Sequence, residues 1–157
     1  MTMKKRCELE GNGQLWPMFL EAHGVLVDLI EHDLMRAGGP PLTWYDVLAQ
    51  LNLAEDNMLP MNRLADSVLL SRSGVTRLVD RMAQEGLVER AACDTDRRIV
   101  YARLTSQGRD LFERSMPVVR AGVSEYFTGL LTGAELTTLR AALLKIVDRA
   151  EAPAEAV

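Results

Sequence analysis

The chain has 157 residues, of which 48% are hydrophobic, 25% charged and only 5% aromatic. This length and apolar content suit one domain of ordinary size, and the scarcity of aromatic residues suits a largely helical protein. No run of about 18 apolar residues occurs, which argues against a membrane span. Residues 1–6 are basic, but the acidic, glycine-containing stretch after them lacks the apolar core of a signal peptide. We therefore expect a cytoplasmic protein.

The net charge of −4 conceals an uneven distribution. Residues 62–103 contain eight arginines and six acidic residues, which gives +2, whereas the remainder has 10 basic and 16 acidic residues, which gives −6. Every basic residue of this central segment is an arginine, and the planar guanidinium suits phosphates and guanine edges. The distribution therefore leaves room for a nucleic-acid surface on an acidic protein.

The sequence shows no pattern typical of a catalytic or metal site. Cys7 and Cys93 match no CxxC pattern and no metal-ligand spacing, so we interpret them as reduced thiols, with redox sensing by either one as the alternative. There is no glycine-rich phosphate loop, HExxH motif or nucleophile elbow. We expect no enzyme, no metal and no cofactor.

Two helices are predicted in the first third of the chain, after a tail over residues 1–13. Apolar residues recur at spacings of three and four over residues 14–37, as in a helix with one buried face. The run Gly38-Gly39-Pro40-Pro41 stops this helix. Thr43 is expected to cap a second helix, with Asp46 in a capping-box position, and that helix ends near Asn52.

The centre of the chain predicts two short helices followed by a β-hairpin. Asn62 is expected to cap a helix over residues 63–68, and Ser71 caps the next one. The second helix ends at Gly86, a typical C′ glycine, and places four apolar residues on one face: Val75, Leu78, Val79 and Met82. Two β-prone runs, residues 87–91 and 99–104, flank a charged turn. This order is that of a winged helix-turn-helix.

The last third predicts two more helices. One begins at Thr105 and runs to Leu130, and Pro117 should kink or break it. Thr132 and Glu135 form a capping-box pattern for a helix over residues 134–150. The predicted fold is a single domain over residues 1–157, mainly α with a small β-wing (α+β). Its winged-helix lobe covers about 42–108, and the helices on either side cover about 14–38 and 106–150.

The outer face of the second short helix carries hydroxyls and arginines, which are residue types that contact bases and phosphates in the major groove. These residues are Arg72, Ser73, Thr76, Arg77 and Arg81. The hairpin tip repeats this chemistry, because Arg97 and Arg98 could enter the minor groove and Asp96 could hold a guanidinium by a bidentate pair. The alternatives are an ordinary solvated helix face and an exposed turn with unrelated charges.

Several segments together resemble the multiple-antibiotic-resistance-regulator (MarR) family, most strongly over roughly residues 59–108. They are Leu64-Ala65-Asp66 and residues 71–82, 85–90, 94–98 and 104–108. The resemblance implies a homodimer that binds double-stranded DNA at pseudo-palindromic operators, often as a repressor. It matches Ser73, Thr76 and Arg77 with major-groove contacts, Arg98 with the minor-groove arginine of the wing, and Arg97 with a phosphate contact.

The resemblance also implies that the first and last helices form the dimer interface. Their apolar stripes are wider than a winged helix of about 50 residues can cover, and pairing two chains would bury them in a helical bundle. The alternative is tight packing of these helices within one monomer.

Members of the family commonly release DNA on sensing a small aromatic or lipophilic anion. Candidate ligand-binding residues are Trp16, His23, Trp44 and Asp46, because aromatic and polar side chains could hold such a molecule. Packing or surface roles are the alternative for each of them. The sequence thus predicts a ligand-responsive repressor, with a winged-helix module for protein–protein contacts and no DNA binding as the alternative function.

Overall fold

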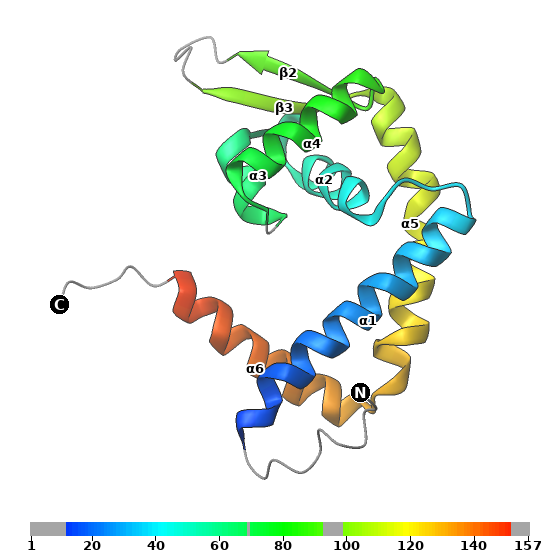
Figure 1. Cartoon of the computed structure of the whole chain (residues 1–157), viewed down its shortest axis with the longest axis vertical. Helices are drawn as coiled ribbons and strands as arrows, with labels where there is room; N and C mark the ends of the chain where they lie inside the picture. The colour runs from blue at the N-terminus through cyan, green and yellow to red at the C-terminus, as the bar shows by residue number, and fades with distance from the viewer. Residues whose placement is uncertain (1–11, 69, 93–98, 152–157) are drawn as a thin grey trace, which may run out of the picture.

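The structure is a computed structural model, and it describes residues 12–68, 70–92 and 99–151. The helices are α1 (Leu15–Arg36), α2 (Leu42–Leu53), α3 (Met61–Ser67), α4 (Arg72–Gln84), α5 (Ser106–Tyr126) and α6 (Gly133–Glu151); the strands are β1 (Met58–Pro60), β2 (Val88–Ala92) and β3 (Val100–Leu104). Three 3-10 turns lie at Asn12–Gln14, Glu55–Asn57 and Thr128–Leu130. The mainly helical fold with a small sheet confirms the predicted class (Figure 1).

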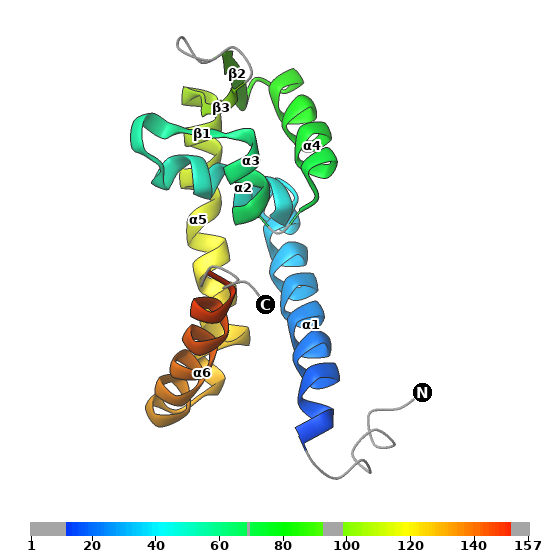
Figure 2. The same ribbon diagram turned by 90° about the vertical axis from the view of Figure 1, so that its left-hand side faces the viewer.

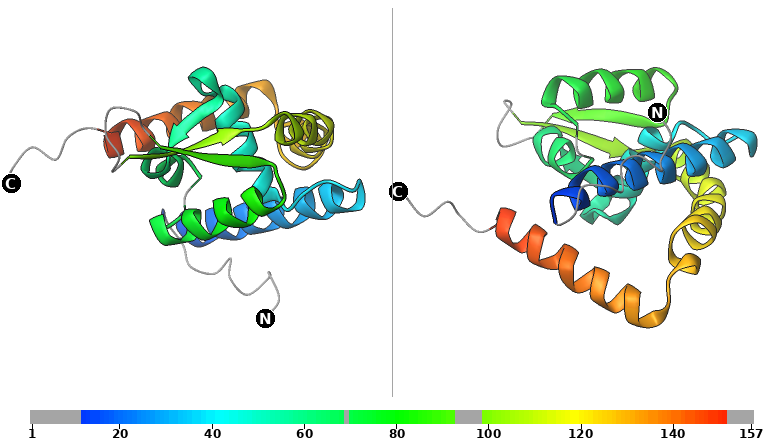
Figure 3. Two further views of the ribbon diagram at one scale, coloured as in Figure 1. Left: turned by 90° about the horizontal axis from the view of Figure 1, so that it is seen from above. Right: turned by 60° about the horizontal axis from the view of Figure 1, so that its bottom comes forward.

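The molecule has a compact lobe at one end and long helices at the other. The lobe contains α2, α3, α4 and the sheet, and α1 and α5 run from it to the opposite end of the molecule (Figures 1 and 2). α6 turns back from the end of α5 and leads away from the other elements (Figure 3). The chain therefore separates a packed lobe from a set of exposed terminal helices.

One apolar cluster fills the lobe, and a smaller one joins α1 to α5. In the lobe, side chains from α2, α3, α4 and the sheet surround Phe112 of α5, whose ring stacks on Tyr45 of α2 with centroids 5.4 Å apart. The second cluster contains Ile30, Leu34 and Leu42 with partly buried α5 side chains. α5 is thus a member of both clusters and links them.

Several predicted helix ends are confirmed by hydrogen bonds. Ser71 caps α4, because its Oγ accepts a bond of 3.1 Å from the N–H of Gly74. Gly86 follows α4 with φ +72°, which a glycine adopts without strain. At α6, the Thr132 N–H donates to Glu135 Oε2 at 2.8 Å, and the Glu135 N–H donates to Thr132 Oγ1 at 3.4 Å. This reciprocal pair is the predicted capping box.

Two predicted caps are wrong. α2 begins at Leu42 and α3 at Met61, so Thr43 and Asn62 lie inside the first turns, and neither helix has a side-chain cap. Prolines occupy the N-cap positions instead, with φ of −52° at Pro41 and −58° at Pro60. A proline ring fixes φ near these values, which favours starting the helix directly after it.

The course of the chain differs from the sequence prediction in two other places. β1 was not predicted; it pairs antiparallel with β3, Met58 opposite Arg103, so the sheet order is β1-β3-β2. α5 continues through Pro117 without a break and ends at Tyr126, four residues before the predicted end. The packing of α1 against Val118, Val119 and Val123, which follow Pro117 on α5, offsets the hydrogen bond that this proline cannot make.

Candidate nucleic-acid interface

α4 separates an apolar face from a polar one, as its sequence predicts. Its four apolar residues are fully or almost fully buried in the lobe. On the other side, the predicted DNA-binding residues Arg72, Ser73, Thr76, Arg77 and Arg81 are all exposed. At 3.6 residues per turn these five positions span about half of the helix circumference. The helix therefore presents a face of hydroxyls and arginines, within which also lies Asp80, paired with Arg90.

Local hydrogen bonds order the start of this face. Ser71 Oγ and Ser73 Oγ lie 3.3 Å apart, and Thr76 Oγ1 donates to the carbonyl of Arg72 at 3.0 Å. The Thr76 hydroxyl oxygen keeps its acceptor capacity, and its methyl group is free to meet a thymine methyl. The backbone N–H groups at a helix N-terminus favour an anion such as phosphate.

An ion pair between α4 and the sheet, which sequence reasoning missed, fixes the neighbouring strand. Arg90 of β2 places Nη2 2.8 Å from Asp80 Oδ1 of α4, and both side chains are partly exposed. An exposed pair of this kind contributes about 0.2–1 kcal/mol. Its main effect is therefore geometric, because it holds the wing strand against the helix that carries the polar face. No sequence periodicity relates these two positions.

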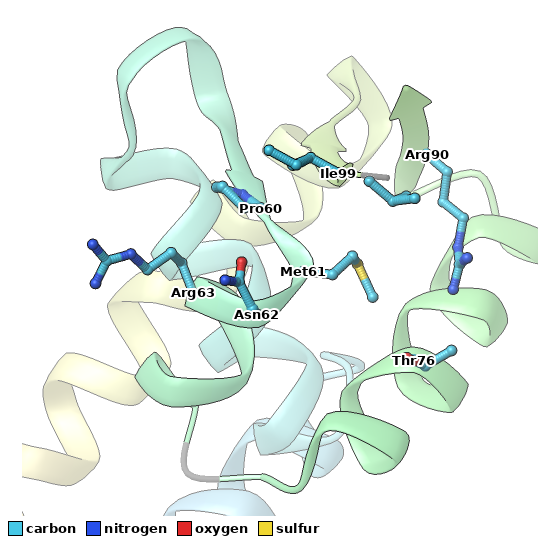
Figure 4. A pocket seen from close by; sticks show the side chains of 8 residues that line it. Pro60, Met61, Asn62, Arg63, Thr76, Arg90 and Ile99 are labelled. Atoms are coloured by element: carbon cyan, nitrogen blue, oxygen red, sulfur yellow. The ribbon is translucent and has the colours of Figure 1, made fainter. Parts of the chain in front are cut away.

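A groove of about 500 Å³ lies beside the polar face of α4. Its lining is Pro60, Met61, Asn62, Arg63, Thr76, Arg90, Ile99 and Val100. Figure 4 shows Met61 pointing towards Thr76 and Arg90, whereas Arg63 points away from them. Thr76 of α4 and Ile99, which directly precedes β3, border the same groove, so the polar face and this end of the described hairpin lie on the same side of the molecule.

The predicted tip of the wing lies outside the described residues. Asp96, Arg97 and Arg98 belong to the segment 93–98, so their DNA contacts stay predictions. The strands on either side are described, and Ala92 of β2 pairs with Val100 of β3 at the end of the ladder. The described part of β3 therefore begins beside the groove, which Val100 lines.

The four candidate ligand residues do not lie together within one chain. Trp16 and His23 are exposed on α1, where Trp16 stacks on Phe19 with ring centroids 6.0 Å apart. Trp44 and Asp46 belong to α2, beyond the other end of α1. At 1.5 Å per residue, the 22 residues of α1 span about 33 Å. One small molecule cannot contact both ends of a helix of this length.

The α2 pair has distinct surroundings. Trp44 is half-buried against the core of the lobe. Partial desolvation of the Asp46 carboxyl and the nearby charge of Glu31 raise the pKa of Asp46 above its usual value. Neither residue lines the groove beside α4.

Among the described residues, no group of histidine, cysteine and acidic side chains is placed to hold a metal ion. None of the helices that the structure describes is both long enough and apolar enough to cross a bilayer.

The terminal helices expose large apolar side chains. On α1 the exposed residues are Leu15, Trp16, Met18, Phe19, Leu20, Val25, Leu29 and Met35, and on α6 they are Leu143, Leu144, Ile146 and Val147. Trp16 is 65% exposed and Ile146 67%. So many exposed large apolar side chains on two helices are unusual on a monomer and mark a protein contact.

Comparison with known protein families and curated proteins gives consistent matches. Residues 39–99 match the family model described as MarR family. The regulator MhqR of Bacillus subtilis is 32% identical over 71 residues, or 45% of this chain and 49% of its own length. The transcriptional repressor MprA of Escherichia coli K12 is 25% identical over 120 residues, or 75% of this chain and 68% of its own. The chain thus spans about half to two-thirds of these relatives.

Solved structures extend the match to almost the whole chain. AbsC, a MarR family transcriptional regulator from Streptomyces coelicolor, superposes with a TM-score of 0.80 at 30% identity, covering 95% of both chains. Sco3205, another member from the same organism, was solved in complex with DNA. It superposes with a TM-score of 0.80 at 29% identity, covering 90% of this chain and 88% of its own.

Proposed function

This chain belongs to the MarR family, and from that premise we propose that it is a transcriptional regulator that binds double-stranded DNA through α4 and the wing. One observation carries the proposal: the exposed hydroxyl-and-arginine face of α4 opens to the same side as the base of the wing. A winged helix-turn-helix needs this arrangement to read the major groove with its second helix and an adjacent groove with its hairpin. The similarity to Sco3205, which was solved in complex with DNA, supports DNA binding.

Each residue of the interface takes a role from its chemistry and position. Ser73, Thr76 and Arg77 contact base edges, because hydroxyls and guanidinium groups suit these edges. Arg72 and Arg81, at the two ends of the polar face, contact phosphates and set the register. In the wing, Arg98 enters the minor groove with Asp96 as its partner, and Arg97 contacts phosphate.

The regulator acts as a homodimer formed by the terminal helices. The exposed apolar side chains of α1 and α6 support this, since a second chain would cover them and a winged-helix lobe of one chain does not. A two-fold dimer places its two α4 helices about 34 Å apart, one turn of DNA, and so selects pseudo-palindromic sites. The chain is then a single domain with a DNA-binding lobe over about 42–108 and dimerisation helices on either side.

The regulator acts in the cytoplasm as a repressor that blocks transcription by occupying its operator. The similarity to MprA, a transcriptional repressor, supports repression rather than activation. Its effector is a small aromatic or lipophilic acid. The candidate residues Trp16, His23, Trp44 and Asp46 form one site only if the partner chain brings its α1 to the α2 of this chain, because α1 separates the two pairs within a chain. Effector binding across the dimer would change the spacing of the lobes and so weaken DNA binding.

Substitution of one arginine in a salt titration tests the DNA interface. Arg77→Ala should weaken operator binding about tenfold or more, from the roughly 1–3 kcal/mol of one base-reading arginine. Lys145→Ala is the matched control, since Lys145 is exposed on α6 at the other end of the molecule and lies on the side of that helix away from its exposed apolar residues. Binding should fall steeply with salt for the unchanged chain. If the two variants bind the operator with equal affinity, α4 is not part of the DNA interface. If the unchanged chain binds no duplex at any salt concentration, the protein–protein module is favoured instead.

A further inference from the structure

A small cavity lies where α1 ends, the chain turns towards α2, and α5 passes alongside. It has a volume of about 80 Å³. Its lining is Leu34, Ala37, Gly38 and Gly39 from the end of α1 and the following turn, and Leu111, Arg114, Ser115 and Val118 from α5. No residue of α2, α4 or the wing contributes, so this cavity is separate from the proposed DNA interface.

A buried hydroxyl without a partner lines this cavity. Ser115 is 3% exposed, and its Oγ makes no hydrogen bond among the described residues. A serine inside a helix usually points to solvent or bonds to the carbonyl four residues earlier, and Ser115 does neither. Leaving a buried hydroxyl without a hydrogen bond is unfavourable. The hydroxyl is therefore available to a polar atom that enters the cavity.

The rest of the lining defines the chemistry of that ligand. Arg114 is exposed at the edge of the cavity and carries a permanent positive charge. Leu34, Leu111 and Val118 supply apolar walls. A carboxylate can accept from a guanidinium and from a hydroxyl together, while a short alkyl group packs on the leucine and valine side chains.

The volume sets an upper limit on the size of the ligand. A single water needs about 10–15 Å³, and an apolar cavity of about 150 Å³ holds benzene. A cavity of about 80 Å³ therefore exceeds one water and is too small for an aromatic acid. We propose that this cavity binds a short-chain aliphatic carboxylate, with the carboxylate on Arg114 and Ser115 and an alkyl group of one or two carbons against Leu34, Leu111 and Val118.

The position of the cavity joins the two packed parts of the chain. Phe112 belongs to the core of the lobe, and Val118 belongs to the cluster that joins α1 to α5, so Ser115 lies between the two. A ligand in this cavity contacts both the end of α1 and α5, and so stabilises the junction between the lobe and the terminal helices. Any effect on DNA affinity rests on the proposed function, but binding of the acid does not.

The test uses the full chain without DNA and propionate as the probe, followed by amide chemical shifts. An acid of this size binds in about the millimolar range. We expect saturable shifts at Gly38, Gly39 and Ser115 with propionate and none there with benzoate. Ser115→Ala should weaken propionate binding about tenfold without lowering the melting temperature, because it removes a hydroxyl that is unsatisfied in the free protein.

Ser124→Ala is the matched control, since Ser124 lies on the same helix and is exposed. Arg114→Gln should weaken binding by a similar factor. Absence of shifts at tens of millimolar propionate would show that only water enters the cavity and would overturn the proposal, as would equal affinity of the Ser115→Ala and Ser124→Ala variants. Because DNA is absent, failure here leaves the operator-binding proposal untouched.

Discussion

Replacing Ile146 of α6 by serine should dissociate the proposed homodimer. Ile146 is 67% exposed in the single chain, and full burial of such a side chain is worth about 1.5–3 kcal/mol. Two-thirds of that value is about 1–2 kcal/mol per chain. A two-fold interface buries both copies, so the loss is about 2–4 kcal/mol per dimer. The dimer dissociation constant should therefore rise roughly 30- to 1,000-fold.

Sedimentation of each variant over a range of concentrations measures this constant. Asp148→Ser is the matched control, because Asp148 lies about 200° around the same helix from Ile146 and the substitution introduces the same residue. Circular dichroism checks that helix content is unchanged. If Ile146→Ser and Asp148→Ser dimerise equally well, α6 does not form the interface and the assignment of the terminal helices fails. A chain that is monomeric before substitution would refute the homodimer altogether.

Three further substitutions test the fold. Ser71→Ala removes the N-cap of α4 and should lower the unfolding free energy by about 1 kcal/mol in urea titrations, and an unchanged midpoint would contradict the cap. Gly108→Ala should give little folded protein in circular dichroism, because the new Cβ would overlap the carbonyl oxygen of Leu87; a normal melting curve would show that the helix shifts freely. The Tyr126 hydroxyl donates to Asp33 at 2.6 Å, and this bond raises the pKa of Tyr126 from 10.0 to about 12. Since the folded-state pKa is the higher one, the stabilisation is complete below about pH 10 and is lost as the pH rises towards 12. Tyr126→Phe should therefore flatten the alkaline fall in melting temperature, and an identical pH profile would exclude the bond.

Local signals in the sequence were sufficient to predict most of the helices. The spacing of apolar residues predicted α1 and α4 to within about a residue, and the caps at Ser71 and Thr132 depend only on neighbouring residues. The wrong caps at Thr43 and Asn62 arose because a proline one or two residues earlier already fixes the backbone for a helix start. Thr43 and Asn62, although residue types that often cap helices, therefore lie inside the first turns of α2 and α3.

Features that depend on distant partners could not be predicted from local patterns. β1 has three residues, one of them a proline, and exists because it pairs with β3 more than 40 residues later. The Asp80–Arg90 ion pair and the unsatisfied hydroxyl of Ser115 also appear only when separate elements meet. The polar face of α4 was predictable, because it is the complement of a clear apolar stripe. The separation of Trp16 from Trp44 could not be predicted, because it follows from the direction in which α1 runs.

The length of α5 has a mechanical consequence. Its 21 residues form a rod of about 31 Å, anchored in the lobe by Phe112 and against α1 near Gly122, where an added Cβ would come within 3.2 Å of Ile30. A tilt of about 5° at the far end moves the near end by roughly 3 Å, close to the 3.4 Å rise of one base pair. In the proposed DNA complex, a shift in helix packing of about an ångström far from the lobe would thereby be magnified into a loss of register on the duplex.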